Sequence, residues 1–160
     1  MARLFFAAAL AVTMALLVLL AHPAAAHTPD VTKSTLKSSK TKFTIVGLAT
    51  TLLPAGQDSV GDRLVMRGDV KADGHGQFKR STVCTLAAVD GAASSYVCQV
   101  ETAFAKGSVV SQGTLVLASG VYTGSLSIIG GNGVFKSVRG IEAVAYTAAT
   151  NAGTIAFSLS

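Results

Sequence analysis

The chain has 160 residues, of which 50% are hydrophobic and only 13% are charged, and its formal net charge at pH 7 is +5. It contains no Trp, and no stretch alternates basic with aromatic residues, which argues against nucleic acid as a partner. A chain of this length is large enough to bury the core of one domain.

The N-terminal segment, residues 1–26, has the features of a secretory signal peptide. Arg3 precedes an apolar run, and the segment ends in Ala24, Ala25 and Ala26. The run is also near the roughly 17 residues that a membrane-spanning helix needs, so an uncleaved anchor is the alternative. The small residues at the end favour cleavage, which predicts a secreted, extracellular protein without a membrane attachment after the signal is removed.

Residues 27–40 are predicted to form a flexible basic N-terminal arm. Lys33, Lys37 and Lys40 follow one another with no acidic residue between them, and apolar residues are sparse. A solvated leader is the simpler interpretation, and contact with an anionic surface is the alternative. The folded domain is then expected to span residues 41–160.

From residue 41 onward the pattern predicts β-strands and no helix, because apolar residues alternate with polar ones or run in short blocks between turn residues. Eight strands are predicted: Lys42–Leu53, Asp62–Lys71, Gln77–Val89, Tyr96–Ala105, Val109–Ala118, Val121–Ile129, Phe135–Thr147 and Thr154–Leu159. Short links rich in Gly and Asn indicate tight turns between antiparallel neighbours. The fold class is therefore all-β, and an eight-stranded antiparallel up-and-down β-barrel is favoured over a sandwich because closure removes exposed edges.

The two cysteines, Cys84 and Cys98, are predicted to form a cross-strand disulfide bond. Residues that face each other across a symmetric hairpin have a constant sum of residue numbers, and the sum for this pair is centred on Gly91 in the turn DGAAS. An exported protein meets an oxidising environment, which favours the bond over two free thiols.

The glycine-rich segment SIIGGNGVFKSVRG, residues 127–140, fits no phosphate-binding loop. Lys136 stands where a dinucleotide loop has its third glycine, and neither flank is predicted to be helical. No Gly-x-Ser-x-Gly nucleophile elbow is present. A metal site would depend on Asp73 and His75, with His27 from the arm, and these are predicted to be turn residues facing water. We therefore expect neither a metal nor a cofactor.

Glutamates within the predicted strands are better candidates for chemistry. Alternation places Glu142 on the strand face of Val144 and Tyr146, and it places Glu101 on the face of Val97. A carboxylate on the apolar face of a barrel could act as a general acid or base. A surface glutamate is the simpler alternative for both residues.

The segment IIGGNGVFKSVRG resembles the glycine-rich signature of dirigent proteins and the related allene oxide cyclase-like barrels. The residues that match this signature are Gly130, Gly131, Asn132, Gly133, Phe135, Arg139 and Gly140. Upstream, GDRLVMRGDV, GQFKRSTVCTL and GSVVSQGTLVL resemble earlier strands of the family. The resemblance implies an eight-stranded antiparallel barrel with an apolar pocket, often trimeric, in which the glycine-rich segment is structural.

Dirigent proteins are exported and hold phenoxy radicals, which an oxidase supplies, so that coupling becomes stereoselective. The related cyclases fold an unstable epoxide into a ring with the help of a pocket glutamate. The resemblance implies a barrel that binds a small hydrophobic or phenolic molecule and steers the stereochemistry of its coupling or cyclisation by orienting it. A cyclase or isomerase with a pocket carboxylate, and a non-catalytic carrier or wall-associated structural protein, are the alternatives. A homo-oligomer, trimer or dimer, is expected.

The candidate site residues follow from the strand faces and the matched segment. The candidate catalytic residues are Glu142, Glu101 and Arg139, and the candidate ligand-binding residues are Tyr122, Tyr146 and Phe135.

Overall fold

A computed structural model describes residues 31–32, 36, 42–53, 59–72 and 75–160. The predicted signal peptide lies outside the described residues, as does most of the predicted arm. Two residues of that arm, Val31 and Leu36, are buried in the hydrophobic core. For these two residues the prediction of a solvated arm is therefore wrong. Among the described residues, no helix has the length and apolar character needed to cross a membrane.

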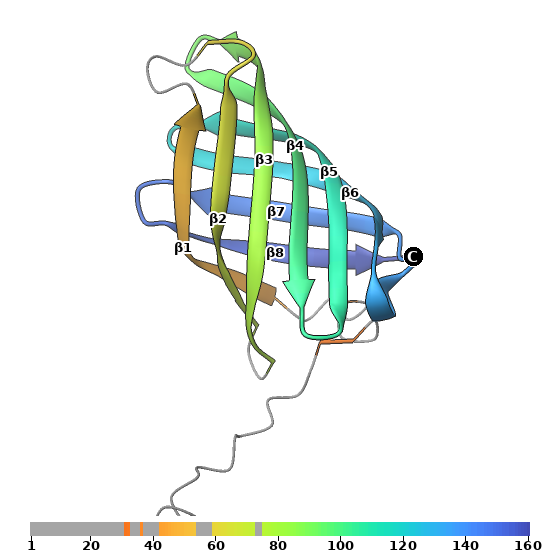
Figure 1. Ribbon diagram of the computed structural model, residues 1–160. Coiled ribbons are helices and arrows are strands. Elements are labelled where there is room, and N and C mark those ends of the chain that lie inside the picture. Colours follow the sequence, from red (N-terminus) through yellow and green to blue (C-terminus); the bar gives the residue numbers. More distant parts are fainter. Residues whose placement is uncertain (1–30, 33–35, 37–41, 54–58, 73–74) are drawn as a thin grey trace, which may run out of the picture.

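The described part of the chain forms eight strands and one short 3-10 helix in a closed antiparallel barrel (Figure 1). In chain order they are β1 (Lys42–Leu53), β2 (Arg63–Ala72), β3 (Gly76–Asp90), β4 (Ala93–Phe104), β5 (Gly107–Ala118), β6 (Val121–Gly131), η1 (Gly133–Phe135), β7 (Gly140–Thr147) and β8 (Ala152–Leu159). Each strand pairs with the next, and β1 pairs with β8 to close the sheet. The predicted fold class is confirmed.

The largest difference from the predicted strands lies between β6 and β7. A strand was predicted from residue 135, but the chain makes η1 there, and β7 begins at Gly140. The Phe135 N–H donates to the Asn132 carbonyl, and the Val138 N–H donates to the Phe135 carbonyl, so consecutive turns replace sheet pairing. Ser137 has a φ of 66°, which an extended strand cannot accommodate.

Alternation along the strands fills the barrel lumen. On β4, Tyr96, Cys98, Val100, Thr102 and Phe104 point inward and are buried, and the residues between them are exposed. This period of two is the geometry of a strand with one face on the core. Each large apolar side chain that is fully buried contributes about 1.5–3 kcal/mol, so the lumen supplies most of the drive to close the sheet.

The two ends of the lumen hold different aromatic side chains. The end near the β4–β5 turn and η1, here called the phenylalanine end, contains Phe43, Phe78, Phe104, Phe135 and Phe157. The opposite end, near the β3–β4, β5–β6 and β7–β8 turns, is called the tyrosine end and contains Tyr96, Tyr122 and Tyr146. Figure 1 shows the turns of the tyrosine end at the upper left and η1 at the lower right.

A disulfide bond joins Cys84 of β3 to Cys98 of β4, as predicted. The two residues are direct cross-strand partners, and both are buried. A buried bond of this kind fits an oxidising environment.

Candidate functional site

A belt of four buried polar side chains crosses the lumen between its two aromatic ends. This polar belt consists of Arg80, Thr102, Ser111 and Glu142, and none of them is more than 4% exposed. Arg80 Nη2 lies 2.6 Å from Glu142 Oε1, and Arg80 Nη1 donates a hydrogen bond to Thr102 Oγ1 at 2.9 Å. The Ser111 hydroxyl donates to Glu142 Oε2 at 2.5 Å. The belt is thus an ion pair whose two members are each held by a hydroxyl group.

Strand register brings these side chains together from opposite walls. Arg80 lies on β3 and Glu142 on β7, which are four strands apart in an eight-stranded barrel. Thr102 is the cross-strand partner of Arg80 on β4, so its hydroxyl stands beside the guanidinium. Gly68 is the partner of Arg80 on β2, and because it has no side chain it leaves lumen space next to Arg80. The long Arg80 side chain can therefore cross toward Glu142.

A buried ion pair is poor evidence of stabilisation. Removing two charges from water costs several kcal/mol per ion, and their mutual attraction repays this only when the geometry is good. An apolar pair of the same volume would often serve the fold equally well. Charged groups kept inside an apolar lumen are therefore candidates for binding or catalysis.

A small cavity lies against the polar belt on the side of the tyrosine end. Its lining includes Arg80, Met66, Leu115, Tyr122 and Tyr146. The space open to the centre of a water molecule is ≈ 10 Å³, which is about the volume that one water molecule requires. A larger guest would fit in this cavity only if the tyrosine side chains moved apart.

The structure places Glu142 in the lumen, beside Val144 and Tyr146 on the same strand face. Alternation predicted the shared face with Val144 and Tyr146, and left open whether that face lies inside the barrel. Tyr122 and Tyr146 line the cavity, and their rings are stacked with centroids 5.9 Å apart. The Tyr146 hydroxyl donates to Asn151 Oδ1 at 2.7 Å, so its outward end is tied to the β7–β8 turn.

Two of the candidate catalytic residues do not reach the lumen. Glu101 is exposed on the outer wall, because it lies between the inward-facing Val100 and Thr102. Arg139 is also exposed, and its Nη1 donates to the Val138 carbonyl at 2.7 Å. The expectation that either residue supports acid–base chemistry inside the barrel is therefore wrong.

Phe135 is a core residue of the phenylalanine end. It is fully buried, and its ring lies 5.1 Å from that of Phe104, centroid to centroid. It does not line the cavity beside Arg80, so its predicted part in ligand binding is not supported by its position.

The sequence reasoning missed Arg80, Thr102 and Ser111. A usable signal was present for Arg80, because alternation places it on the same strand face as the apolar Phe78 and Cys84. A cation on an otherwise apolar face indicates an interior partner. Ser111 carried no comparable signal, since a small hydroxyl residue is common on either face of a strand.

The glycine-rich segment has the structural role that was expected. Gly133 has a φ of 56°, and a Cβ atom on it would lie 2.1 Å from the Lys106 carbonyl oxygen. The Asn132 side-chain oxygen accepts a hydrogen bond from the Ser108 N–H at 2.8 Å. Asn132 and its glycine neighbours therefore fasten the β6–β7 connection onto the start of β5.

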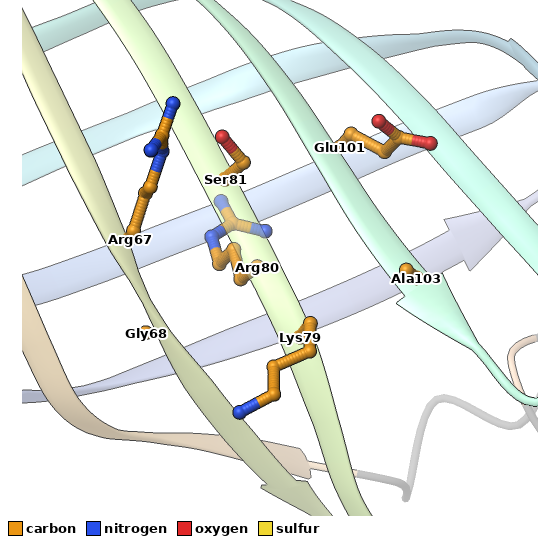
Figure 2. Close-up of a pocket in the computed structure, with 7 residues that line it drawn as sticks. All are labelled: Arg67, Gly68, Lys79, Arg80, Ser81, Glu101 and Ala103. Carbon is orange, nitrogen blue, oxygen red and sulfur yellow. The ribbon is translucent and has the colours of Figure 1, made fainter.

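The outer wall carries charge near the phenylalanine end. Arg67 of β2, Lys79 of β3 and Glu101 of β4 surround a hollow of ≈ 380 Å³ on three neighbouring strands (Figure 2). Lys79 Nζ lies 2.6 Å from Asp69 Oδ1, and its hydrogen bond to that carboxylate lowers the pKa of Asp69. Among the described residues, no three His, Cys, Asp or Glu side chains gather in an arrangement that could hold a metal ion.

Comparison with known proteins supports the fold. No family model matches the chain, and no curated protein matches it. Among solved structures, a pyocyanin demethylase is similar, with a TM-score of 0.57 and 15% sequence identity over 75% of this chain and 96% of that one. A likeness at this identity shows a shared closed eight-stranded barrel. The resemblance to dirigent and allene oxide cyclase-like proteins is not confirmed by these comparisons.

Proposed function

We propose that this protein binds a small hydrophobic or phenolic molecule through the tyrosine end of its barrel and orients it against the polar belt. The observation that carries the proposal is the buried Arg80–Glu142 ion pair, whose Arg80 lines the lumen cavity together with Tyr122 and Tyr146. A binding pocket of this kind combines apolar and aromatic walls with a few placed polar groups. The structurally similar barrel is, as its name states, a demethylase of pyocyanin.

The belt supports proton transfer to or from an oriented guest. A phenolic hydroxyl or an acidic C–H group that reaches Glu142 can give its proton to the carboxylate. Arg80 then stabilises the negative charge that develops on the guest, and Ser111 keeps the carboxylate in place. Steering of coupling or cyclisation follows from orientation alone, because a fixed pose exposes only one face of the guest. An isomerase or cyclase with Glu142 as its base is the catalytic form of this proposal.

A non-catalytic carrier is the second candidate. The filled lumen favours it, because the cavity at the belt has space for about one water molecule. In that case the tyrosine end would open to admit the guest, and the ion pair would serve only to hold it.

We also propose that the protein is secreted and forms a homo-oligomer. The disulfide bond supports export, since such bonds persist in oxidising compartments. The outer positions of β5 and β6 support self-association, because they carry uncharged side chains such as Val116, Thr114 and Thr123 and include the exposed Ile129. Light scattering of the purified protein tests this directly, and a monomer across the measured concentrations would contradict it.

The test of the proposed function combines binding with product analysis. Coniferyl alcohol is titrated while tyrosine fluorescence is recorded, a signal that no Trp obscures. The same alcohol is then oxidised by a laccase with and without the protein. We expect saturable binding and an excess of one stereoisomer among the coupled products.

The Glu142→Gln variant should bind at least about tenfold more weakly, a change of roughly 1.4 kcal/mol. The Asp90→Asn variant removes an equal charge from the exposed end of β3 and is the matched control. Binding without any change in product ratio would favour the carrier. Absence of saturable binding to phenols would overturn the proposal.

A further inference from the structure

A second hollow lies on the outer wall, where the glycine-rich segment meets β4 and β5. Its volume is ≈ 490 Å³, within the size range of small-molecule sites. The lining residues that matter here are Glu101, Ser108, Val110, Ile129, Ser137 and Arg139. We call it the glycine-rich hollow. It lies outside the barrel and shares no residue with the cavity in the lumen.

Opposite charges stand at the two ends of one row across the sheet. Glu101 of β4 is the partner of Val110 on β5, and Val110 is the partner of Gly130 on β6. The Arg139 guanidinium covers Gly130, since its Nη1 lies 3.4 Å from the position that a Cβ atom there would occupy. Strands lie about 4.8 Å apart, so the attachment points at Glu101 and Gly130 are about 10 Å from each other. Val110 provides an apolar floor between the two charges.

A buried hydroxyl group in the same hollow lacks a partner. Ser108 is 3% exposed, and its Oγ has no hydrogen bond within the described residues. Its backbone is fully engaged, because its N–H donates to Asn132 Oδ1 and its carbonyl accepts from the Asn132 N–H. A buried hydroxyl without a partner is unfavourable, and a ligand at this position can supply the missing bond.

The backbone around the hollow is irregular where a ligand would lie. The β5–β6 register shifts between Val110 and Ser111, which leaves Ile129 of β6 without a cross-strand partner. Such a bulge re-aims side chains and is frequent beside functional sites. Ser137 lines the hollow with a φ of 66°, a left-handed conformation that is unfavourable for a residue with a side chain.

We propose that the glycine-rich hollow binds a small dipolar molecule of the amino-acid class. Its carboxylate pairs with the Arg139 guanidinium, which has five N–H donors and gives one of them to Val138. Its ammonium group pairs with Glu101. The carbon chain of the ligand lies over Val110, and the Ser108 hydroxyl forms a hydrogen bond with the carboxylate or the ammonium group of the ligand. A hollow with one charge of each sign favours a ligand that is itself net neutral.

The test uses a series of amino acids in which the distance between the charges increases. Glycine, 4-aminobutyrate and 6-aminohexanoate are titrated up to about 50 mM while amide NMR shifts are recorded, since two exposed charge pairs predict millimolar affinity. We expect saturable shifts confined to residues of the hollow, with 4-aminobutyrate or 6-aminohexanoate binding more tightly than glycine. N-acetylation or methyl esterification of the best ligand should weaken binding about tenfold or more.

Variants assign the two charges. Arg139→Gln and Glu101→Gln should each weaken binding about tenfold, and Ser108→Ala by a smaller factor. Lys136→Gln, an exposed cation of the same segment outside the hollow, should leave binding unchanged.

The proposal is overturned if no probe gives saturable shifts, or if the acetylated or esterified ligand binds as tightly as the unmodified one. It is also overturned if Arg139→Gln and Glu101→Gln both bind the ligand as tightly as the natural chain does. Tighter binding of glucuronate than of the amino acids, unchanged by Glu101→Gln, would overturn it as well. If a second copy of the chain fills the hollow, the probes will not bind and Arg139→Gln will lower the measured mass. Because Glu142 and the lumen play no part, failure here leaves the proposed function untouched.

Discussion

The two ends of the lumen are built from the same kind of side chain and yet differ in what they can do. At the phenylalanine end, the rings of Phe43, Phe78, Phe135 and Phe157 all lie within 6.5 Å of Phe104, centroid to centroid. At the tyrosine end, Tyr96, Tyr122 and Tyr146 form a chain of contacts in which each ring carries a hydroxyl group.

The difference shows how one barrel can separate stability from function. Phenyl rings bring only apolar area and ring contacts, so the phenylalanine end serves to close the barrel. Tyrosine rings keep a polar atom that needs a partner, so their packing is conditional on hydrogen bonds and can be rearranged. The polar belt lies between the ends, and its Arg80 lines the cavity on the tyrosine side. Variants of either end, or of the belt, therefore test this separation.

Truncation of Phe104 should give the largest loss of stability. Phe104→Ala removes the ring that contacts the other four phenylalanines and leaves a cavity, which costs about 3–5 kcal/mol. Denaturant unfolding of the variant and of the natural chain measures this difference. Val134→Ala is a control from the adjacent η1 turn, because Val134 is exposed and should change stability by less than about 0.5 kcal/mol. Equal losses in the two variants would contradict a stabilising phenylalanine end.

Breaking the ion pair should cost slightly less, and removing both charges should restore the loss. Glu142→Gln leaves the Arg80 guanidinium buried without its counter-charge, which costs about 3 kcal/mol. The double variant Arg80→Met with Glu142→Leu should be close to the natural chain in stability, because no buried charge is left unpaired. A stable double variant that no longer binds phenols would show that the belt serves function. A double variant as unstable as the single one would assign the belt to the fold.

Loss of the disulfide bond should affect stability at the tyrosine end. The bond closes a loop with a sequence separation of 14, for which chain entropy gives about 3 kcal/mol. The Cys84→Ala and Cys98→Ala double variant should therefore unfold at lower denaturant concentration. Hydrogen exchange should increase first in the parts of β3 and β4 that lie at the tyrosine end, next to Tyr96. Increased exchange that begins instead around Phe104 would contradict the separation of the two ends.

A single hydroxyl group at the tyrosine end should have a modest effect on stability and a clear one on binding. Tyr146→Phe removes the hydrogen bond to Asn151 and costs about 1 kcal/mol, since the ring itself stays packed. Asn151 has a φ of 49°, so this bond also helps to hold a strained turn residue. Phenol titration and thermal unfolding of the same sample give both effects. An unchanged affinity would place the ligand elsewhere.

The strands, the closed barrel and the disulfide bond could be predicted from the sequence. The turn residues and the alternation gave the eight strands and the closed barrel, and the index sum gave the Cys84–Cys98 pair, because each of these depends on local spacing. The same rule placed Glu142 on the face of Val144 and Tyr146 and Glu101 on the face of Val97, but it did not decide which of these faces is interior.

The polar belt could not be predicted, because its members come from β3, β4, β5 and β7 and meet only when the sheet closes. Arg80 and Glu142 are separated by four strands, and nothing in their local spacing specifies that distance. The segment around Arg139 was misjudged for a related reason. Its apolar pattern resembles a strand, while the turn hydrogen bonds of Phe135 and Val138 decide its conformation.

The smallest expected effect on stability comes from the ion pair between Lys79 of β3 and Asp69 of β2 on the outer wall. Lys79 lowers the pKa of Asp69, so the charged carboxylate is favoured in the folded state. The stability that this gives is fully present above the ordinary Asp pKa of 3.8 and is lost as the pH falls through the lower folded value. The Asp69 side chain is half-buried, but its partner Lys79 is 81% exposed, so water screens the pair and the contribution should be small and should shrink further in high salt. Acid unfolding of Asp69→Asn against the natural chain should show a difference at neutral pH that disappears below that range. A difference that persists in strong acid, or in molar salt, would show that Asp69 acts through packing and not through its charge.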